Sequence, residues 1–195
     1  LVQLDGIARY WPNLGNGNFG PAREMKASPG GLKLGEPGVV LLDANGNGRA
    51  DLVVSRPGQS GYYPLTYAGE WDKRGFKAWP QAPSFELTAP DVALVDLDGD
   101  GVTDAVRMGA ALECWFNDPK EGWYDFKRIT KAQFDDFPVV DLSDPRVKWA
   151  DMNGDGLRDL VVVYRGAAEY WPSMGRGKFL SLIHISEPTR QAEIS

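Results

Sequence analysis

Short apolar runs broken by turn-forming residues recur along the whole chain. Each run is bounded by Gly, Asp, Asn or Pro, as expected for β-strands joined by tight turns. The clearest four are residues 92–96, 104–109, 112–117 and 124–129. The best helical candidate, residues 130–137, is short and is followed by Pro138. The pattern therefore predicts an all-β protein.

The pattern repeats with a period of about 53 residues. Three acidic loops begin at Asp43, Asp96 and Asp151, so that the steps between them are 53 and 55 residues. Dipeptides that begin with an aromatic residue recur in phase with these loops, namely Trp11-Pro12, Tyr63-Pro64, Trp115-Phe116 and Trp171-Pro172. Residues 1–19 and 161–179 are identical at nine of nineteen positions. A repeat of this length indicates an architecture built from one structural unit used several times.

A unit of four antiparallel strands and about 53 residues has the size of a β-propeller blade. Such blades bury their apolar faces only against neighbouring blades. A stack of independent hairpins would leave Trp11, Trp115, Trp149 and Trp171 without a core. We therefore expect residues 1–180 to form part of a β-propeller, about three blades. The chain starts late in the second strand of one blade and stops inside a fourth, so we expect a fragment that cannot close a ring alone.

Residues 181–195 differ from the rest of the chain because they lack both the glycine-rich turns and the acidic loops. The stretch SLIHISEPTR resembles the translated read-through of a transposon-based sequencing adapter. We interpret residues 181–195 as a non-native tail and leave them outside the fold argument. This removes His184, the only histidine, and with it every Ser-His or Cys-His catalytic arrangement.

Charge and composition narrow the possible partners. The formal net charge is −6 and the sequence pI is about 4.9, so nucleic acids and anionic membrane surfaces would be repelled. No apolar run approaches the 18 or so residues that span a bilayer, which argues against membrane insertion. The chain begins inside a repeat, so the lack of a leader does not bear on secretion. The single cysteine, Cys114, excludes an intrachain disulfide and is expected in a strand.

The three acidic loops share the pattern D-x-[DN]-x-[DN]-G-x-x-D, which predicts calcium binding. Alternate side chains of a tightly curled loop converge on one point, and Ca²⁺ takes six to eight oxygen ligands. Arg49, Val102 and Leu157 would contribute backbone carbonyl oxygens. The expected ligands are Asp43, Asn45, Asn47, Arg49 and Asp51 in the first loop, Asp96, Asp98, Asp100, Val102 and Asp104 in the middle loop, and Asp151, Asn153, Asp155, Leu157 and Asp159 in the last loop.

The acidic loops have three other interpretations, namely an EF-hand, a polar turn and a catalytic site. An EF-hand requires glutamate at the twelfth loop position, where this chain has Val54, Arg107 and Val162. Polar turns whose side chains cap their own backbone remain an alternative. A catalytic role is disfavoured, because carboxylates bound to calcium are poor general bases and no other polar group repeats with them. Since affinity follows ligand charge, we expect the middle loop to bind most tightly and the first loop most weakly.

Two further motifs were considered for ligand binding. The stretch GNGNFG, residues 15–20, matches a phosphate-binding glycine pattern, but Pro21 follows it and its repeat counterpart GRGKF is expected to be a turn between strands. The repeated aromatic residues could stack on sugars, but their fixed place in each unit favours packing between blades. They are Trp11, Tyr62, Tyr63, Trp115, Trp123 and Trp171.

The repeats and loops together resemble a region that is shared by the B component of bacterial insecticidal toxin complexes (Tc toxins) and by SpvB-type virulence proteins. That region contains integrin-like FG-GAP/VCBS repeats. The resemblance covers nearly all of residues 1–180. The segments that carry it are YWPNLGNGNFG, DLDGDGVTDAVRMG, CWFNDPKEGW, SDPRVKWADMNGDGLRDLVVVYRG and EYWPSMGRGKF.

The resemblance implies a secreted, non-enzymatic protein. In that family the B component joins an RHS-repeat C component to form a shell around a toxic polypeptide, and the propeller docks on the pore-forming A component and gates release. The family's metal loops match the three acidic loops above, although the first loop carries two asparagines. The alternative function is that of a calcium-dependent adhesin or lectin with the same kind of propeller.

Overall fold

The computed structural model describes residues 1–26, 28–71, 73–118, 120–133 and 136–186. Its elements are β-strands and one short 3₁₀ helix, Lys131–Gln133. The all-β prediction is therefore confirmed for these residues. The helical candidate at residues 130–137 contains only this single turn among its described positions, and residues 134–135 lie outside them.

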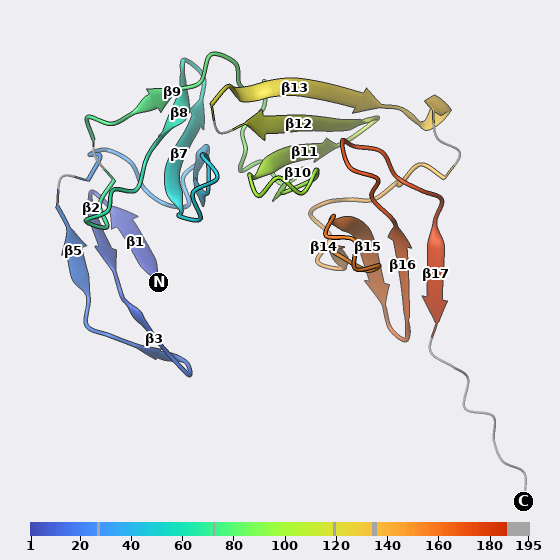
Figure 1. Cartoon of the computed structure of the whole chain (residues 1–195), viewed down its shortest axis with the longest axis horizontal. Coiled ribbons are helices and arrows are strands. Elements are labelled where there is room, and N and C mark those ends of the chain that lie inside the picture. Colours follow the sequence, from blue (N-terminus) through green and yellow to red (C-terminus); the bar gives the residue numbers. More distant parts are fainter. Residues whose placement is uncertain (27, 72, 119, 134–135, 187–195) are drawn as a thin grey trace, which may run out of the picture.

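The strands form four successive antiparallel sheets, numbered here in chain order (Figure 1). The first sheet has three strands, β1 (Val2–Asp5), β2 (Ile7–Tyr10) and β5 (Arg23–Met25). A two-stranded hairpin, β3 (Asn13–Gly15) and β4 (Asn18–Phe19), lies between β2 and β5 in the chain. The second sheet contains β6 (Val39–Leu42), β7 (Asp51–Arg56), β8 (Gln59–Tyr63) and β9 (Lys77–Ala78).

The third and fourth sheets repeat the order of the second. The third contains β10 (Val92–Val95), β11 (Asp104–Met108), β12 (Leu112–Asp118) and β13 (Gly122–Ile129). The fourth contains β14 (Val147–Ala150), β15 (Asp159–Tyr164), β16 (Ala167–Trp171) and β17 (Ile183–Ser186). Each strand pairs with the next one along the chain, so all three sheets are simple meanders. The four strands expected between residues 92 and 129 are all present.

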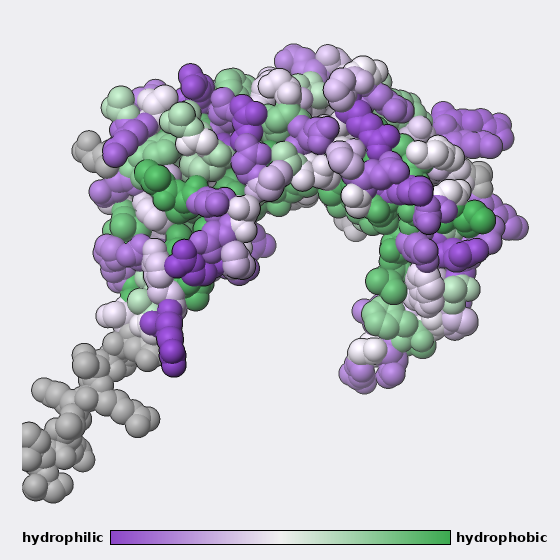
Figure 2. All heavy atoms as spheres, turned by 180° about the vertical axis from the view of Figure 1, so that it is seen from behind, coloured by the Kyte–Doolittle hydropathy of each residue, from purple (hydrophilic) through white to green (hydrophobic). Residues whose placement is uncertain are grey.

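The sheets follow one another around an open arch, with the first and fourth sheets at its two ends (Figure 1). Seen from behind, the molecule is hollowed between these ends (Figure 2). No strand of the first sheet pairs with a strand of the fourth in the described part of the chain.

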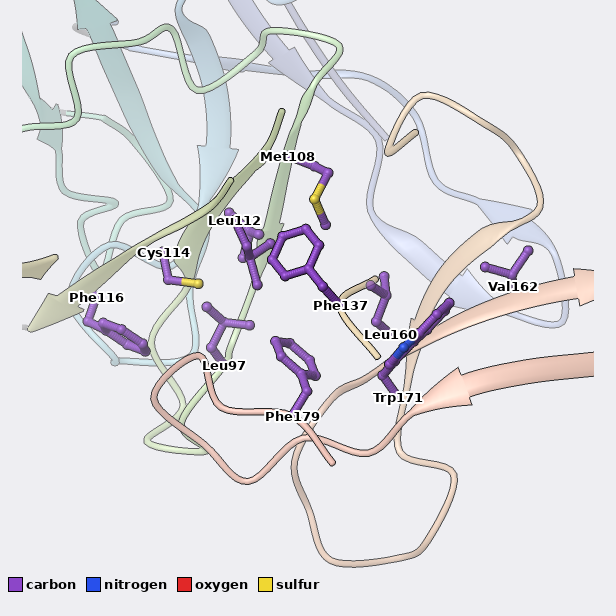
Figure 3. Close-up of a cluster of buried hydrophobic side chains, with 11 residues drawn as sticks. Leu97, Met108, Leu112, Cys114, Phe116, Phe137, Leu160, Val162, Trp171 and Phe179 are labelled. Carbon is purple, nitrogen blue, oxygen red and sulfur yellow. The ribbon is translucent and has the colours of Figure 1, made fainter. Parts of the chain in front are cut away.

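Three apolar clusters form the core, one at each junction between neighbouring sheets. The first-to-second junction includes Leu4, Ala8, Met25, Leu52, Val54 and Trp71. The second-to-third junction includes Leu42, Val53, Tyr62, Leu87, Ala105 and Trp123. The third-to-fourth junction includes Leu97, Leu112, Cys114, Phe137, Leu160, Trp171 and Phe179 (Figure 3). Because side chains alternate along each strand, the middle sheets contribute to two junctions at once.

A proline turn that the sequence analysis did not single out leads into each of the last three sheets. The segments are Glu36–Val39, Ala89–Val92 and Asp144–Val147, each with proline in second place. The valine N–H donates to the carbonyl of the first residue at 3.1, 3.0 and 2.9 Å, respectively. The carbonyl of the third residue accepts an N–H from the neighbouring second strand of the sheet, at 2.8, 3.1 and 3.0 Å. This turn fixes where each first strand begins.

Part of the segment that we interpreted as a non-native tail takes part in the fold. Residues Ile183–Ser186 form β17 and pair with Ala167–Tyr170 of β16. All four β17 side chains are exposed, and the backbone pairing is accompanied by a contact between Nδ1 of His184 and Oε1 of Glu169 at 3.0 Å. Leaving this segment outside the fold was therefore too strict for residues 183–186. Its origin stays a prediction, and residues 187–195 lie outside the described residues.

Candidate metal-binding loops

The three acidic loops occupy equivalent places in the second, third and fourth sheets. Each connects the first strand of its sheet to the second, β6 to β7, β10 to β11 and β14 to β15. Each loop turns at glycines with positive φ, such as Gly99 (78°) and Gly101 (86°) in the middle loop. These are left-handed conformations that glycine adopts without a steric penalty, which lets the loop curl back within a few residues.

The last aspartate of each loop ties the loop to the sheet. Asp51, Asp104 and Asp159 are at most 1% exposed. In each, Oδ2 accepts the N–H of the second loop residue, from Ala44 (3.3 Å), Leu97 (2.9 Å) and Met152 (2.9 Å). Oδ1 accepts an N–H donated near the end of the third strand of the sheet. The donors are Leu65 (2.9 Å) and Ser173 (2.7 Å), which follow the strand, and Asn117 (2.9 Å), which lies in its last residues. The three carboxylates therefore have a structural role whether or not metal is bound.

The first aspartate of each loop accepts hydrogen bonds from its own loop backbone. Asp96 accepts the N–H groups of Gly99 (2.7 Å) and Gly101 (3.0 Å). Asp151 does the same with Gly154 (2.6 Å) and Gly156 (3.0 Å), and these bonds lower its pKa. This is the arrangement of a polar turn that caps its own backbone, the alternative reading of these loops.

The middle loop differs because its carboxylates converge. Asp96, Asp98 and Asp104 can place one oxygen each within 4.8 Å of the others, a spacing that a metal ion could bridge. Oδ1 of Asp98 is buried and has no hydrogen-bond partner. A buried acceptor without a partner is unfavourable, and a cation at this point would satisfy it. The Asp96, Asp98 and Asp104 triad therefore fits a hard cation with oxygen ligands.

The electrostatics of the middle loop agree with this fit. Burial raises the pKa of Asp98, and the neighbouring carboxylates of Asp100 and Asp96 raise it further. Burial also raises the pKa of Asp104 to about 7, although the N–H groups of Asn117 and Leu97 oppose this shift. Both shifts arise mainly because burial removes water from the charged carboxylates, and a cation between them would favour the charged forms.

Asparagines occupy the corresponding positions of the other two loops and change the hydrogen bonding. In the first loop the Asn45 amide donates to Oδ2 of Asp51 at 2.6 Å. In the last loop the Asn153 amide donates to Asp155 at 2.9 Å. Within the described residues, a group of three converging Asp, Glu, His or Cys side chains occurs only in the middle loop.

The structure thus brings together part of the expected ligand set. Three of the five residues expected in the middle loop form the triad, whereas Asp100 is exposed and accepts the N–H of Val102 at 2.7 Å. Asn47 and Asp155 likewise accept the N–H groups of Arg49 (2.9 Å) and Leu157 (2.8 Å). Carbonyl coordination by Arg49, Val102 and Leu157 stays a prediction.

The remaining candidates of the sequence have structural surroundings. Cys114 is buried in the third-to-fourth junction, and burial raises the pKa of its thiol to about 12. The glycine-rich stretch at residues 15–20 forms the turn of the β3–β4 hairpin and opens no helix. Among the repeated aromatics, Tyr62, Trp123 and Trp171 are buried at junctions. In the described part of the chain, no helix is long and apolar enough to span a membrane.

Comparisons with known proteins add a likeness of fold. No protein-family model and no curated protein matches the chain. Among solved structures, a lectin from Agrocybe aegerita that specifically recognises non-reducing terminal N-acetylglucosamine aligns with a TM-score of 0.56 and 19% identity. The alignment covers 94% of this chain and 47% of the lectin chain, so this chain spans about half of that fold. At this identity the likeness concerns fold alone.

A second solved structure, that of TcdB2–TccC3, is also similar to this chain. Its alignment has 17% identity and covers 94% of this chain but 11% of that one, with a TM-score of 0.39. A score this low carries no argument about function.

Proposed function

We propose that this chain is a calcium-stabilised β-propeller segment that works by docking to other proteins and catalyses no reaction. The proposal rests on one repeated structural unit, a four-stranded sheet with an acidic loop between its first two strands. In the middle copy of this unit, three carboxylates of the loop converge. The resemblance to Tc-toxin B components and SpvB-type proteins supplies the expected setting, a secreted toxin complex.

The blade interpretation is supported by how the sheets bury their faces. Every junction between neighbouring sheets in the described part of the chain is filled by apolar side chains. Phe179, in the connection between β16 and β17, is 9% exposed at the junction with the third sheet, while its repeat counterpart Phe19, in the β3–β4 hairpin, is 53% exposed. A further sheet beside the first would cover Phe19 in the same way, as in a propeller.

The calcium interpretation rests on the middle loop. Asp96, Asp98 and Asp104 would hold the ion with carboxylate oxygens, the ligands that Ca²⁺ prefers. When bound, calcium would link the end of β10 to the start of β11 and relieve the repulsion among the three carboxylates. When the free calcium concentration is a hundred times the dissociation constant of the site, binding would stabilise the folded state by about 2.7 kcal/mol. The proposed role of the metal is therefore structural.

The docking interpretation rests on the type of residues that repeat. The carboxylates of the loops are committed to backbone N–H groups or to the triad, and the repeated aromatics fill sheet junctions. The resemblance assigns the docking partners, an A-like pore component and a C-like RHS component. Nucleic acid is disfavoured as a partner by the net charge of −6.

Calorimetric titration of the whole chain with calcium tests the metal site. We expect one site to be lost in Asp98→Asn, which removes the charge next to the unpartnered oxygen, and to be retained in the exposed control Asp91→Asn. If the folded wild-type chain binds no calcium, the metal-site interpretation is wrong and all three loops are polar turns. Interferometry against a purified pore-forming component, with and without chelator, then tests docking.

A lectin function is the second candidate, favoured by aromatic side chains beside the loops. Tyr67 is 96% exposed, and the Arg49 guanidinium of the first loop lies 4.3 Å from its ring centre. Exposed aromatic rings provide stacking surfaces for sugars, and a lectin shares the fold. Calcium-dependent binding on a glycan array that is lost in Tyr67→Ala would favour this function over protein docking.

A further inference from the structure

The third sheet holds an arginine in contact with a carboxylate and an aromatic ring. Arg107 on β11 pairs in register with Glu113 on β12. Its Nε donates to Oε2 of Glu113 at 2.9 Å, and its Nη2 donates to the same oxygen. Cζ of Arg107 also lies 4.8 Å from the ring centre of Phe85, a cation–π contact. In this sheet the chain therefore supplies its own cation beside the glutamate.

The fourth sheet has the same glutamate but not the arginine. Val162 on β15 pairs with Glu169 on β16 as Arg107 pairs with Glu113. Arg107 and Val162 both stand three residues after the last aspartate of their acidic loop, so they are repeat counterparts. Because valine is short and uncharged, position 162 offers Glu169 no cation. The place that the arginine fills in the third sheet is therefore not filled by residue 162 in the fourth.

A groove lies at this place in the fourth sheet. Its volume is about 510 Å³, within the range of about 300–1,000 Å³ typical of ligand sites. Side chains alternate along a strand, so the lining residues of β15 and β16 share one face of the sheet. They are Val162, Tyr164, Glu169 and Trp171. Figure 3 shows Val162 and Trp171 beside the strands of the fourth sheet. The groove therefore combines a carboxylate with two aromatic rings.

Carboxylates dominate the charge of the groove. Asp141 and Asp144 line it together with Glu169, whereas Arg146 is the one basic residue in its lining. The Arg146 guanidinium is bound to Asp144 through Nε at 3.1 Å and Nη2 at 2.6 Å, so these two charges balance each other. Asp141 accepts the N–H and the hydroxyl of Ser143, which are both uncharged donors. The groove therefore keeps the negative charges of Asp141 and Glu169 and suits a positively charged ligand.

Glu169 has two further contacts, and neither supplies a permanent positive charge. The Tyr164 hydroxyl donates to Oε2 of Glu169 at 3.1 Å. Nδ1 of His184 lies 3.0 Å from Oε1, and the His184 side chain is 66% exposed. An imidazole is charged only when it is protonated. Because a carboxylate has about four lone-pair sites, Glu169 can still accept hydrogen bonds from a cation in the groove.

We propose that the groove binds an arginine side chain of a partner protein. The guanidinium donates to Glu169 and packs against the aromatic lining, as the chain's own arginine does in the third sheet. Arginine is preferred to lysine because its planar group donates two N–H groups to one carboxylate and also stacks on rings. The partner presents a basic residue to an acidic chain, whose net charge is −6. The protein nature of the partner rests on the proposed docking function, whereas the chemistry of the groove does not.

Nuclear magnetic resonance titration of the whole chain with N-acetylarginine N-methylamide tests the groove. The comparison compound is the citrulline analogue, which has a similar shape but no charge. We expect saturable shifts of the backbone amides around Val162 and Glu169 with the arginine compound only. Glu169→Gln should weaken binding about tenfold, because it removes a hydrogen bond between charged groups. Asp91→Asn, at an exposed aspartate outside the groove, should bind as the wild type does. Equal binding of both compounds, or equal binding by wild type and Glu169→Gln, would overturn the proposal.

Val162→Arg places the arginine in the chain itself. Its guanidinium should bind Glu169 and exclude the arginine compound, and urea unfolding should show a coupling between Val162→Arg and Glu169→Gln. A folded Val162→Arg variant that binds the compound like wild type would overturn the proposal, and if this variant does not fold, Glu169→Gln decides alone. The titration contains neither calcium nor a partner protein. A chain that binds the arginine compound but neither calcium nor a pore-forming component would contradict the proposed function and leave the groove standing.

Discussion

At the scale of single residues, carboxylates divide into those that hold the backbone and those that carry excess charge. Asp51, Asp104 and Asp159 are buried and receive two backbone N–H groups each. Asp98 instead keeps a buried oxygen without a partner. Aspartate in place of asparagine at the third loop position therefore distinguishes the middle loop from both counterparts, and the first loop also has Asn47 where the middle loop has Asp100.

Asp144 provides a pH-dependent prediction away from the loops. Arg146 donates to it through Nε at 3.1 Å and Nη2 at 2.6 Å, and these bonds lower the Asp144 pKa to about 2. A folded-state pKa below the unfolded value of 3.8 stabilises the fold above pH 4, and this contribution is lost as the pH falls toward 2. Asp144→Asn should therefore be less stable than wild type at pH 6, and the difference should vanish near pH 2.

Urea unfolding at a series of pH values measures this difference, with Asp91→Asn as the control at an exposed aspartate. A difference between wild type and Asp144→Asn that stays constant from pH 6 to pH 2 would contradict the role of the Arg146 contact.

The sequence predicted the positions of the loop residues but not the contacts that distinguish them. Spacing alone placed Asp96, Asp98 and Asp104 in one loop, because a tight loop joins neighbours in the chain. Leu157 is 58 positions beyond Gly99, and its approach to that glycine depends on how the fourth sheet packs on the third. Contacts between distant segments have no signature in local spacing, so residue patterns could not reveal this one.

At the scale of elements, glycines allow close approach between neighbouring sheets. Gly122 begins β13 with φ 73°, and a Cβ atom there would lie 2.6 Å from Cδ1 of Trp79. Trp79 in turn packs edge-on against Trp123, with ring centres 5.4 Å apart. The second and third sheets are therefore locked together at a point where no side chain fits at position 122.

Replacing Gly122 with alanine should destabilise the protein more than the positive φ alone explains. Gly58 has φ 78° and open space around it, so Gly58→Ala isolates the backbone cost of about 1 kcal/mol. Overpacking against Trp79 should add about 1–3 kcal/mol in Gly122→Ala. Thermal and urea unfolding compare the two variants, and equal losses would show that Trp79 moves aside without cost.

The strands themselves were the most predictable elements. Alternating apolar residues and Gly, Asp and Asn turns located all four strands of the third sheet. The β17 pairing was not expected, because its side chains are exposed and add to the backbone hydrogen bonds with β16 one exposed contact, between His184 and Glu169. An edge strand offers unpaired backbone N–H and C=O groups with which many different sequences can pair, so the side-chain pattern of the added strand does not predict the pairing.

At the scale of the whole molecule, position in the arch decides how much a side chain contributes. Phe19 and Phe179 occupy equivalent places in their repeats, but only Phe179 has a preceding sheet to pack against. Phe179→Ala should lower the free energy of unfolding by about 3–5 kcal/mol, and Phe19→Ala by less than about 1 kcal/mol. Chemical denaturation of both variants measures this contrast. Similar losses would mean that the fourth sheet is not stabilised by the third.

The strictly sequential order of the sheets has a consequence for synthesis on the ribosome. Each sheet consists of one continuous stretch of chain and buries a face against the sheet made before it. As domains fold from the N-terminus during translation, each new sheet would emerge beside a partner that is already complete. Apart from the outer side of the first sheet, the uncovered apolar face then belongs to the latest sheet, so each step exposes the face of one new unit to misassembly.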